Sequence, residues 1–195
     1  MTFRGWFATT ALLAPAALAS PGAGPAPATY EIDGVHSSVL FRIKHFDASF
    51  VYGRFNEVSG TLVYDEASPA ASSVEVTIKA DSVDTHNAGR DKHLKSPDFF
   101  NAEEFPVLSF KSKSVKGSGK GGGLEVTGDL TIHGVTKPVT VKGVHTGTGK
   151  GMKGEERAGF ETTFTIKRSD FGMRFMAEAL GDEVQITVAL EGVKK

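Results

Sequence analysis

The chain has 195 residues, of which 39% are hydrophobic, 23% charged and 9% aromatic, a composition typical of one soluble globular domain or a small pair. Its 22 basic and 23 acidic residues give a formal net charge of -1 and are spread along the chain, which argues against a nucleic-acid-binding protein. There is no cysteine, which excludes disulfides, cysteine zinc sites and thiol nucleophiles. The 23 glycines follow no three-residue period and favour a turn-rich β protein.

The N-terminal segment has the pattern of a secretory signal peptide. Arg4 is followed by an apolar run over 7–18 and by Ala17-Leu18-Ala19, the small-residue pattern that precedes cleavage. The run is too short to cross a bilayer, which needs ~20 residues. A buried N-terminal helix is the alternative, and Pro15 and the following Pro/Gly/Ala segment argue against it. We therefore predict export to the periplasm, with a signal peptide at 1–19, a linker at 20–29 and a folded domain at 30–195.

Most of the remaining chain alternates apolar and polar residues with the period of two that is typical of half-buried strands. Val39, Phe41 and Ile43 share one face of such a segment, for example, while Arg42 and Lys44 share the other. This pattern predicts eight strands, over 39–45, 53–64, 74–79, 108–111, 124–132, 139–142, 160–167 and 184–191. Turn compositions lie between them at 68–69, 117–123 and 147–154.

One segment, 84–100, breaks the alternation and has few β-branched residues. It predicts a short helix over 87–95, between the third and fourth predicted strands, followed by a turn before Phe99-Phe100. Because every half-buried strand must bury one face, an all-β sandwich or a closed barrel is expected. The mostly short connections favour a barrel of eight antiparallel strands with up-and-down topology. A barrel of eight strands is filled by side chains or holds one ligand.

Small residues at inward positions favour the hollow form of this barrel. Gly128, Gly143 and Thr162 have the same parity as the apolar residues of their strands. They leave volume for an apolar ligand or, alternatively, mark a bulge or bend. The chain has 14 phenylalanines against 3 tyrosines and 1 tryptophan, and a lining poor in hydrogen-bond donors suits a hydrocarbon. The alternative is that these rings simply fill the core.

Catalytic and metal-binding patterns are weak. Among the six histidines, His86 and His93 are seven residues apart near Asp91, a spacing that puts ligands on one helix face or makes a hydrogen-bonded cluster. No H-E-x-x-H or G-x-S-x-G motif is present. The run 119–123 resembles a phosphate-binding loop only in composition. We therefore predict no enzyme, no metal and no cofactor, and keep a periplasmic enzyme or metal protein on the same barrel as the alternative.

Several blocks of residues stand in a distinctive order along the chain. They are Asp33-Gly34-Val35-His36-Ser37, Arg90-Asp91-Lys92-His93-Leu94-Lys95-Ser96, Gly128-Asp129-Leu130-Thr131-Ile132-His133-Gly134 and Arg168-Ser169-Asp170-Phe171-Gly172-Met173. Their order and spacing resemble the YceI family of exported polyisoprenoid-binding proteins, over about residues 30–193. The resemblance implies a lipocalin-like barrel whose long apolar pocket binds an isoprenoid chain, such as a quinone or polyprenyl tail, or another long-chain amphiphile. It implies no established catalytic activity.

Strand pattern and resemblance together give the residues expected to line the pocket: Phe41, Ile43, Phe55, Phe110, Gly128, Leu130, Thr162, Phe164, Phe171 and Met173. Arg90, His93 and Arg168 are expected either to meet the ligand headgroup or, for the two arginines, to pair with the nearby Asp91 and Asp170. The expected partner is a polyisoprenoid or similar amphiphilic lipid, with no nucleic acid and no stable membrane insertion. The oligomeric state is left open, a homodimer included.

Overall fold

The computed structural model describes Met1, residues 27–117 and residues 123–195. The predicted signal peptide after Met1, the predicted linker as far as residue 26 and most of the predicted turn at 117–123 lie outside these ranges. The described strands are β1 (Ala28–Ile32), β2 (Ser38–His45), β3 (Ser49–Phe55), β4 (Val58–Tyr64), β5 (Ser73–Lys79), β6 (Val83–Asp84), β7 (Val107–Gly117), β8 (Gly123–Ile132), β9 (Val135–Lys150), β10 (Glu156–Lys167) and β11 (Leu180–Lys194).

These strands form one antiparallel sheet that closes into a barrel because β1 pairs with β4 on one side and β11 on the other. Three positions of the barrel each hold two short strands. β1 and β2 pair with successive parts of β11, β3 continues into β4, and β5 continues into β6 after a short 3-10 helix, η2 (Ala80–Ser82). The described strands therefore occupy eight positions, and the predicted eight-stranded antiparallel barrel is confirmed.

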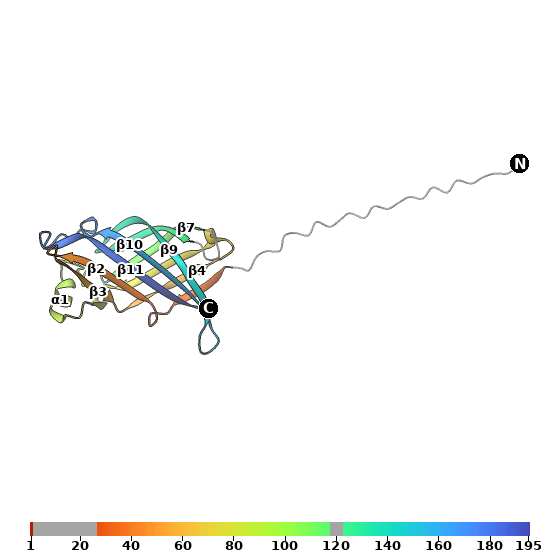
Figure 1. Ribbon diagram of the computed structural model, residues 1–195, viewed down its shortest axis with the longest axis horizontal. Coiled ribbons are helices and arrows are strands. Elements are labelled where there is room, and N and C mark those ends of the chain that lie inside the picture. Colours follow the sequence, from red (N-terminus) through yellow and green to blue (C-terminus); the bar gives the residue numbers. More distant parts are fainter. Residues whose placement is uncertain (2–26, 118–122) are drawn as a thin grey trace.

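The barrel is elongated, with its strands inclined to its long axis (Figure 1). At one end lie the β2–β3 hairpin tip, the helix α1 (Ala88–Leu94) and the segment 172–179, and at the other lies the C-terminus. The predicted helix is confirmed in place and nearly in length. Asn87 is its N-cap, and the Asn87 side-chain oxygen accepts a hydrogen bond from the Arg90 backbone N–H (2.9 Å).

Two strand predictions differ from the structure. β1 was not predicted, and it begins at Ala28, inside the segment expected to be a linker. β9 runs to Lys150 although glycines led us to expect a turn from residue 147, because Gly147 and Gly149 are held in the ladder opposite Gly159 and Arg157 of β10. Backbone pairing between the two strands of this long hairpin thus overrides the local preference of the glycines for a turn.

The β9–β10 ladder does not run the full length of the barrel. It ends at Gly143 and Thr162, beyond which β9 stays paired with β8 and β10 with β11. The Thr162 hydroxyl donates a hydrogen bond to the Lys142 carbonyl (2.7 Å) where the two strands part. Beyond this point the 3-10 helix η3 (Arg168–Phe171) follows β10 and contacts β9. No helix in the described ranges is long and apolar enough to cross a membrane.

Candidate functional site

The inside of the barrel contains a cavity of about 380 Å³, within the range of small-molecule pockets. Its lining is almost entirely apolar and includes seven of the 14 phenylalanines: Phe41, Phe55, Phe99, Phe100, Phe110, Phe160 and Phe164. Two inward residues of β11 show that this space is empty. Ile186 and Val188 lie on a strand paired on both sides, yet both keep solvent-accessible surface, because their side chains face the cavity.

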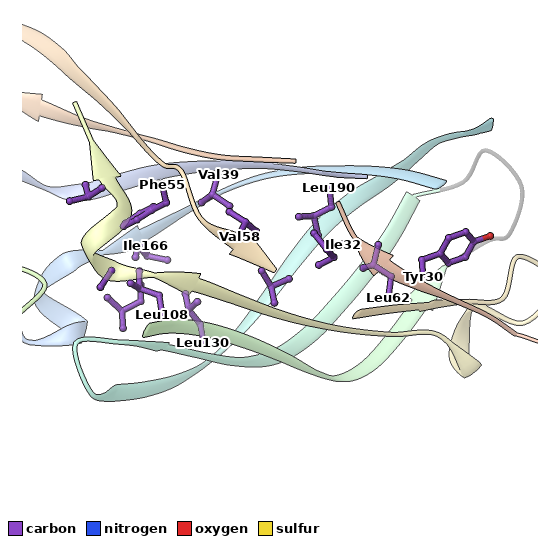
Figure 2. Close-up of a cluster of buried hydrophobic side chains, with 14 of the residues drawn as sticks. Tyr30, Ile32, Val39, Phe55, Val58, Leu62, Leu108, Leu130, Ile166 and Leu190 are labelled. Carbon is purple, nitrogen blue, oxygen red and sulfur yellow. The ribbon is translucent and has the colours of Figure 1, made fainter. Parts of the chain in front are cut away.

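The interior is not hollow throughout. Tyr30, Ile32, Val58 and Leu62 are buried on β1 and β4 and do not line the cavity. Figure 2 shows the buried side chains spread along the barrel, with Tyr30 and Leu62 well away from Phe55. The two alternatives for the aromatic and aliphatic residues, a packed core and a hollow barrel, therefore hold in different parts of one interior.

Of the ten residues predicted to line the pocket, the structure brings eight together around the cavity: Phe41, Ile43, Phe55, Phe110, Leu130, Thr162, Phe164 and Met173. Phe41 and Phe55 are neighbours on β2 and β3, with ring centroids 5.7 Å apart. Arg90, His93 and Arg168 also line the cavity.

Gly128 and Phe171 do not line the cavity, for different physical reasons. A Cβ at Gly128 would lie 2.4 Å from the Lys111 carbonyl oxygen and 2.6 Å from the Phe110 ring. The glycine therefore lets Phe110 lie flat against β8 and leaves no room for a ligand. Phe171 is 2% exposed, and its carbonyl accepts a hydrogen bond from His133 Nδ1 (3.1 Å), so it packs beside the β8–β9 turn.

Several lining residues were not among those predicted. Val184, Ile186 and Val188 of β11 alternate with polar residues, so the strand pattern was sufficient to find them. Leu94 of α1 and the following Phe99 and Phe100 also line the cavity, although they belong to no strand of the barrel. They belong to an irregular segment in which no periodicity indicates the side that is buried.

Polar side chains gather where α1 meets the cavity. Arg90 Nε donates to the Thr85 hydroxyl (2.7 Å), and Arg90 Nη2 donates to the Thr85 carbonyl (2.7 Å). The Asp91 carboxylate accepts hydrogen bonds from the Thr85 backbone N–H (2.8 Å) and from its hydroxyl. Arg90 and Asp91 are thus both hydrogen-bonded to Thr85, and the alternative of an Arg90–Asp91 ion pair is not found among the described residues.

His93 and Arg168 have different surroundings. His93 Nε2 hydrogen-bonds with Asp98 (2.8 Å), and the His93 ring is edge-on to Phe99 and Phe175. Arg168 is buried and donates to four backbone carbonyls, those of Met173, Phe175, Leu180 and Gly181. Burial lowers the pKa of Arg168, and no ion pair with Asp170 is found in the described ranges. The main role of Arg168 is to hold the segment before β11 in place.

A second polar pair lies toward the other end of the barrel. Tyr64 lines the cavity, its hydroxyl is 3.4 Å from His145 Nδ1, and burial raises the pKa of Tyr64. Phe160 packs edge-on against the Tyr64 ring, with centroids 5.0 Å apart. This cluster places the cavity's tyrosine hydroxyl among aromatic rings.

Among the described residues, a group of three side chains that each offer a ligand atom to a cation lies outside the cavity, at the break between β1 and β2. Asp33, His36 and Glu191 place their ligand atoms close together. Arg157 already supplies a positive charge there, with Nη1 3.0 Å from Asp33 Oδ2 and hydrogen-bonded to Glu191. Hydrogen bonds from His36 and Arg157 lower the pKa of Asp33 to about 2. His86 and His93, the pair considered for a metal, are not part of this group.

Relatives and solved structures resemble this chain over most of its length. A "UPF0312 protein" of Pseudomonas aeruginosa is 44% identical over 170 residues, which cover 86% of this chain and 88% of the relative. "Protein YceI" of Escherichia coli is 45% identical over the same shares of both chains.

Among solved structures, Burkholderia cenocepacia BcnA superposes with a TM-score of 0.74 at 27% identity, covering 82% of this chain and 98% of its own. The YCEI protein of Campylobacter jejuni gives 0.69 at 35% identity, covering 75% and 86%. A domain of Saccharophagus degradans, described as polyisoprenoid-binding, gives 0.66 at 16% identity, covering 85% and 98%, which supports the fold.

The YceI-like domain family model matches residues 30–192, which contain every residue that lines the cavity. With relatives at 44–45% identity over most of both chains, this match shows that the chain belongs to the YceI-like family.

Proposed function

We propose that the protein binds one long apolar chain, of the isoprenoid class, inside the barrel. This proposal rests on the empty cavity of about 380 Å³, whose lining offers few hydrogen-bond donors. A hydrocarbon satisfies such walls without leaving hydrogen-bonding groups unpaired. The structural neighbour from Saccharophagus degradans, described as a polyisoprenoid-binding domain, supports the same class of ligand.

Tail burial supplies the binding free energy. Each CH₂ removed from water contributes ~0.8 kcal/mol, so a five-carbon isoprene unit contributes about 4 kcal/mol before ordering costs. A few buried units therefore reach micromolar affinity, which corresponds to about 8 kcal/mol. The gain ends when the cavity is full, so affinity rises with chain length and then levels off.

The α1 end of the barrel suits a polar headgroup. Arg90 uses Nε and Nη2 to bind Thr85, and Nη1 has no protein partner within the described residues. His93 stands next to it on the cavity wall. A quinone carbonyl or a polyprenyl phosphate would meet these donors, whereas Arg168 has already committed its donors to backbone carbonyls. We place the protein in the periplasm on the strength of the N-terminal signal pattern, with no catalytic step and no cofactor.

Mass spectrometry of an organic extract tests this function on protein purified from its native host. A stoichiometric lipid with a long apolar chain is the expected result. Elemental analysis of the same sample provides the comparison with the alternative of a metal protein. A stoichiometric metal and no extractable lipid would show that the proposal is wrong.

A further inference from the structure

At the α1 end of the barrel the β2–β3 hairpin tip lies against the segment before β11 (Figure 1), and both segments expose apolar side chains. Phe46 at the β2–β3 tip is 64% exposed, and Phe50 on β3 is also exposed. Phe175 and Met176, in the segment before β11, are each 41% exposed. The Phe46 backbone N–H donates to the Ala179 carbonyl (2.7 Å), which holds the hairpin tip against that segment.

Cations lie beside these apolar residues on the outward face of the β2–β3 hairpin. The Arg42 guanidinium carbon is 4.4 Å from the centroid of the Phe50 ring, and Lys44 Nζ is 5.5 Å from it. Arg42 and Lys44 belong to no ion pair within the described part of the chain. Asp47, at the tip, is the single acidic residue of 38–55. We call Arg42, Lys44, Phe46, Phe50, Phe175 and Met176 the rim surface.

We propose that the rim surface docks reversibly on an anionic lipid bilayer. Aromatic and thioether side chains partition into the interface between headgroups and acyl chains, and neighbouring cations bind the phosphates. The rim surface combines both kinds of side chain within one end of the molecule. Within the β2–β3 hairpin Arg42 and Lys44 outnumber Asp47, whereas the segment 172–179 carries Arg174 and Glu178, so the hairpin supplies the excess of positive charge that orients the protein.

The rim surface is continuous with the cavity. Met176 is both exposed and part of the cavity lining, and His45, next to Phe46, lines the cavity as well. Docking would therefore bring this edge of the cavity to the hydrocarbon boundary. An apolar chain would pass between the bilayer and the barrel without crossing water. This goes beyond ligand binding itself, because it specifies the surface from which the ligand is taken.

A second copy of the chain fits the rim surface less well than a bilayer does. In a twofold-symmetric dimer through this face, the same patch lies on both sides of the interface. Arg42 and Lys44 would then approach their own counterparts, with Asp47 alone to offset them on each hairpin. Like charges brought together in this way weaken association.

Vesicle sedimentation tests the proposal with delipidated full-length mature protein. The vesicles are phosphatidylcholine alone or phosphatidylcholine mixed with phosphatidylglycerol. We expect binding to the anionic vesicles that weakens with added salt. The double variant Arg42→Gln/Lys44→Gln should bind about 30-fold more weakly, since each cation near the surface contributes ~1 kcal/mol. The variant Phe46→Ser/Phe50→Ser should lose at least about tenfold.

Matched controls change the same kinds of residue elsewhere. Lys137→Gln/Lys153→Gln removes two exposed cations, and Val35→Ser/Met152→Ser removes two exposed apolar side chains; both should bind vesicles like the unchanged protein. Thermal melting identifies any variant that does not fold. If Phe46→Ser/Phe50→Ser does not fold, vesicle binding by Arg42→Gln/Lys44→Gln decides the result.

A fluorescent farnesyl probe, titrated without vesicles, separates docking from ligand binding. The rim variants should keep their affinity for this probe. Absence of binding to anionic vesicles, or equal losses in the control variants, would overturn docking even if the probe still binds. A dimer that the rim variants dissociate, seen by sedimentation velocity, would assign the rim surface to a second copy and also overturn it.

Discussion

Replacing Val188 with phenylalanine would put a ring into the middle of the cavity. Val188 lies opposite Thr162 on β10 and opposite Val39 on β2, and all three residues line the empty space. The added atoms therefore point into a volume that other side chains do not occupy. In a packed interior the same substitution would force its neighbours apart.

The two situations predict different magnitudes. Overpacking a filled core typically costs ~1–3 kcal/mol of unfolding free energy, so the same substitution in a hollow barrel should cost less than that. The ring takes up about the space of one isoprene unit, and excluding five carbons at ~0.8 kcal/mol each costs about 4 kcal/mol of binding, roughly a 1,000-fold loss of affinity. A ligand that shifts along the cavity recovers part of this, which leaves a loss of at least about tenfold.

Thermal melting of the delipidated variant and a titration with an isoprenoid probe measure the two effects side by side. We expect Val188→Phe to melt within a few degrees of the unchanged protein and to bind the probe much more weakly. A strongly lowered melting temperature together with unchanged affinity would refute the assignment of this volume to the ligand.

Three further predictions concern residues around the cavity. Gly128→Ala should cost about 1–3 kcal/mol in urea unfolding, because its Cβ would collide with the Lys111 carbonyl, while the folded fraction keeps its affinity. Arg168→Met should cost at least about 3 kcal/mol and expose the segment 172–179 to protease, because four carbonyls lose a charged donor. For Asp33, the pKa of about 2 lies below its ordinary value of 3.8, so its stabilisation is present above about pH 4 and is lost as the pH falls through 2. Asp33→Asn should remove up to about 2 kcal/mol of this acid dependence, measured by unfolding at pH 5 and pH 2.

The alternation of apolar and polar residues was enough to predict the barrel, because every long strand has one face in the interior. It was not enough for β1, whose five residues follow a Pro/Ala-rich segment and carry only Tyr30 and Ile32 as inward residues. Pairing with β4 and β11 makes this a strand, and such distant partners leave no trace in a short window of sequence.

The candidate site also divides into residues that the sequence pattern indicates and residues that depend on distant contacts. Phe164 and Leu130 line the cavity, on the side of their strands that parity indicates. Parity also placed Gly128 inward, but it gave no information about the Phe110 ring that covers it. Whether a small residue leaves a hole depends on the neighbour across the strand. The role of Arg168 likewise depends on the carbonyls of a segment that begins five residues further on.

Because the first and last strands close the barrel, its interior is complete only when both strands are in place. Tyr30 pairs with Lys194, so the contact that seals the wall joins residues separated by almost the whole folded chain. Folds that depend on such distant pairings form slowly, on the millisecond to second scale. Because β11 also supplies one wall of the cavity, a nascent chain has no binding site until its last strand has been synthesised and has docked. Under the proposed function, ligand capture therefore follows closure of the barrel, and a bound chain would stabilise the closed form.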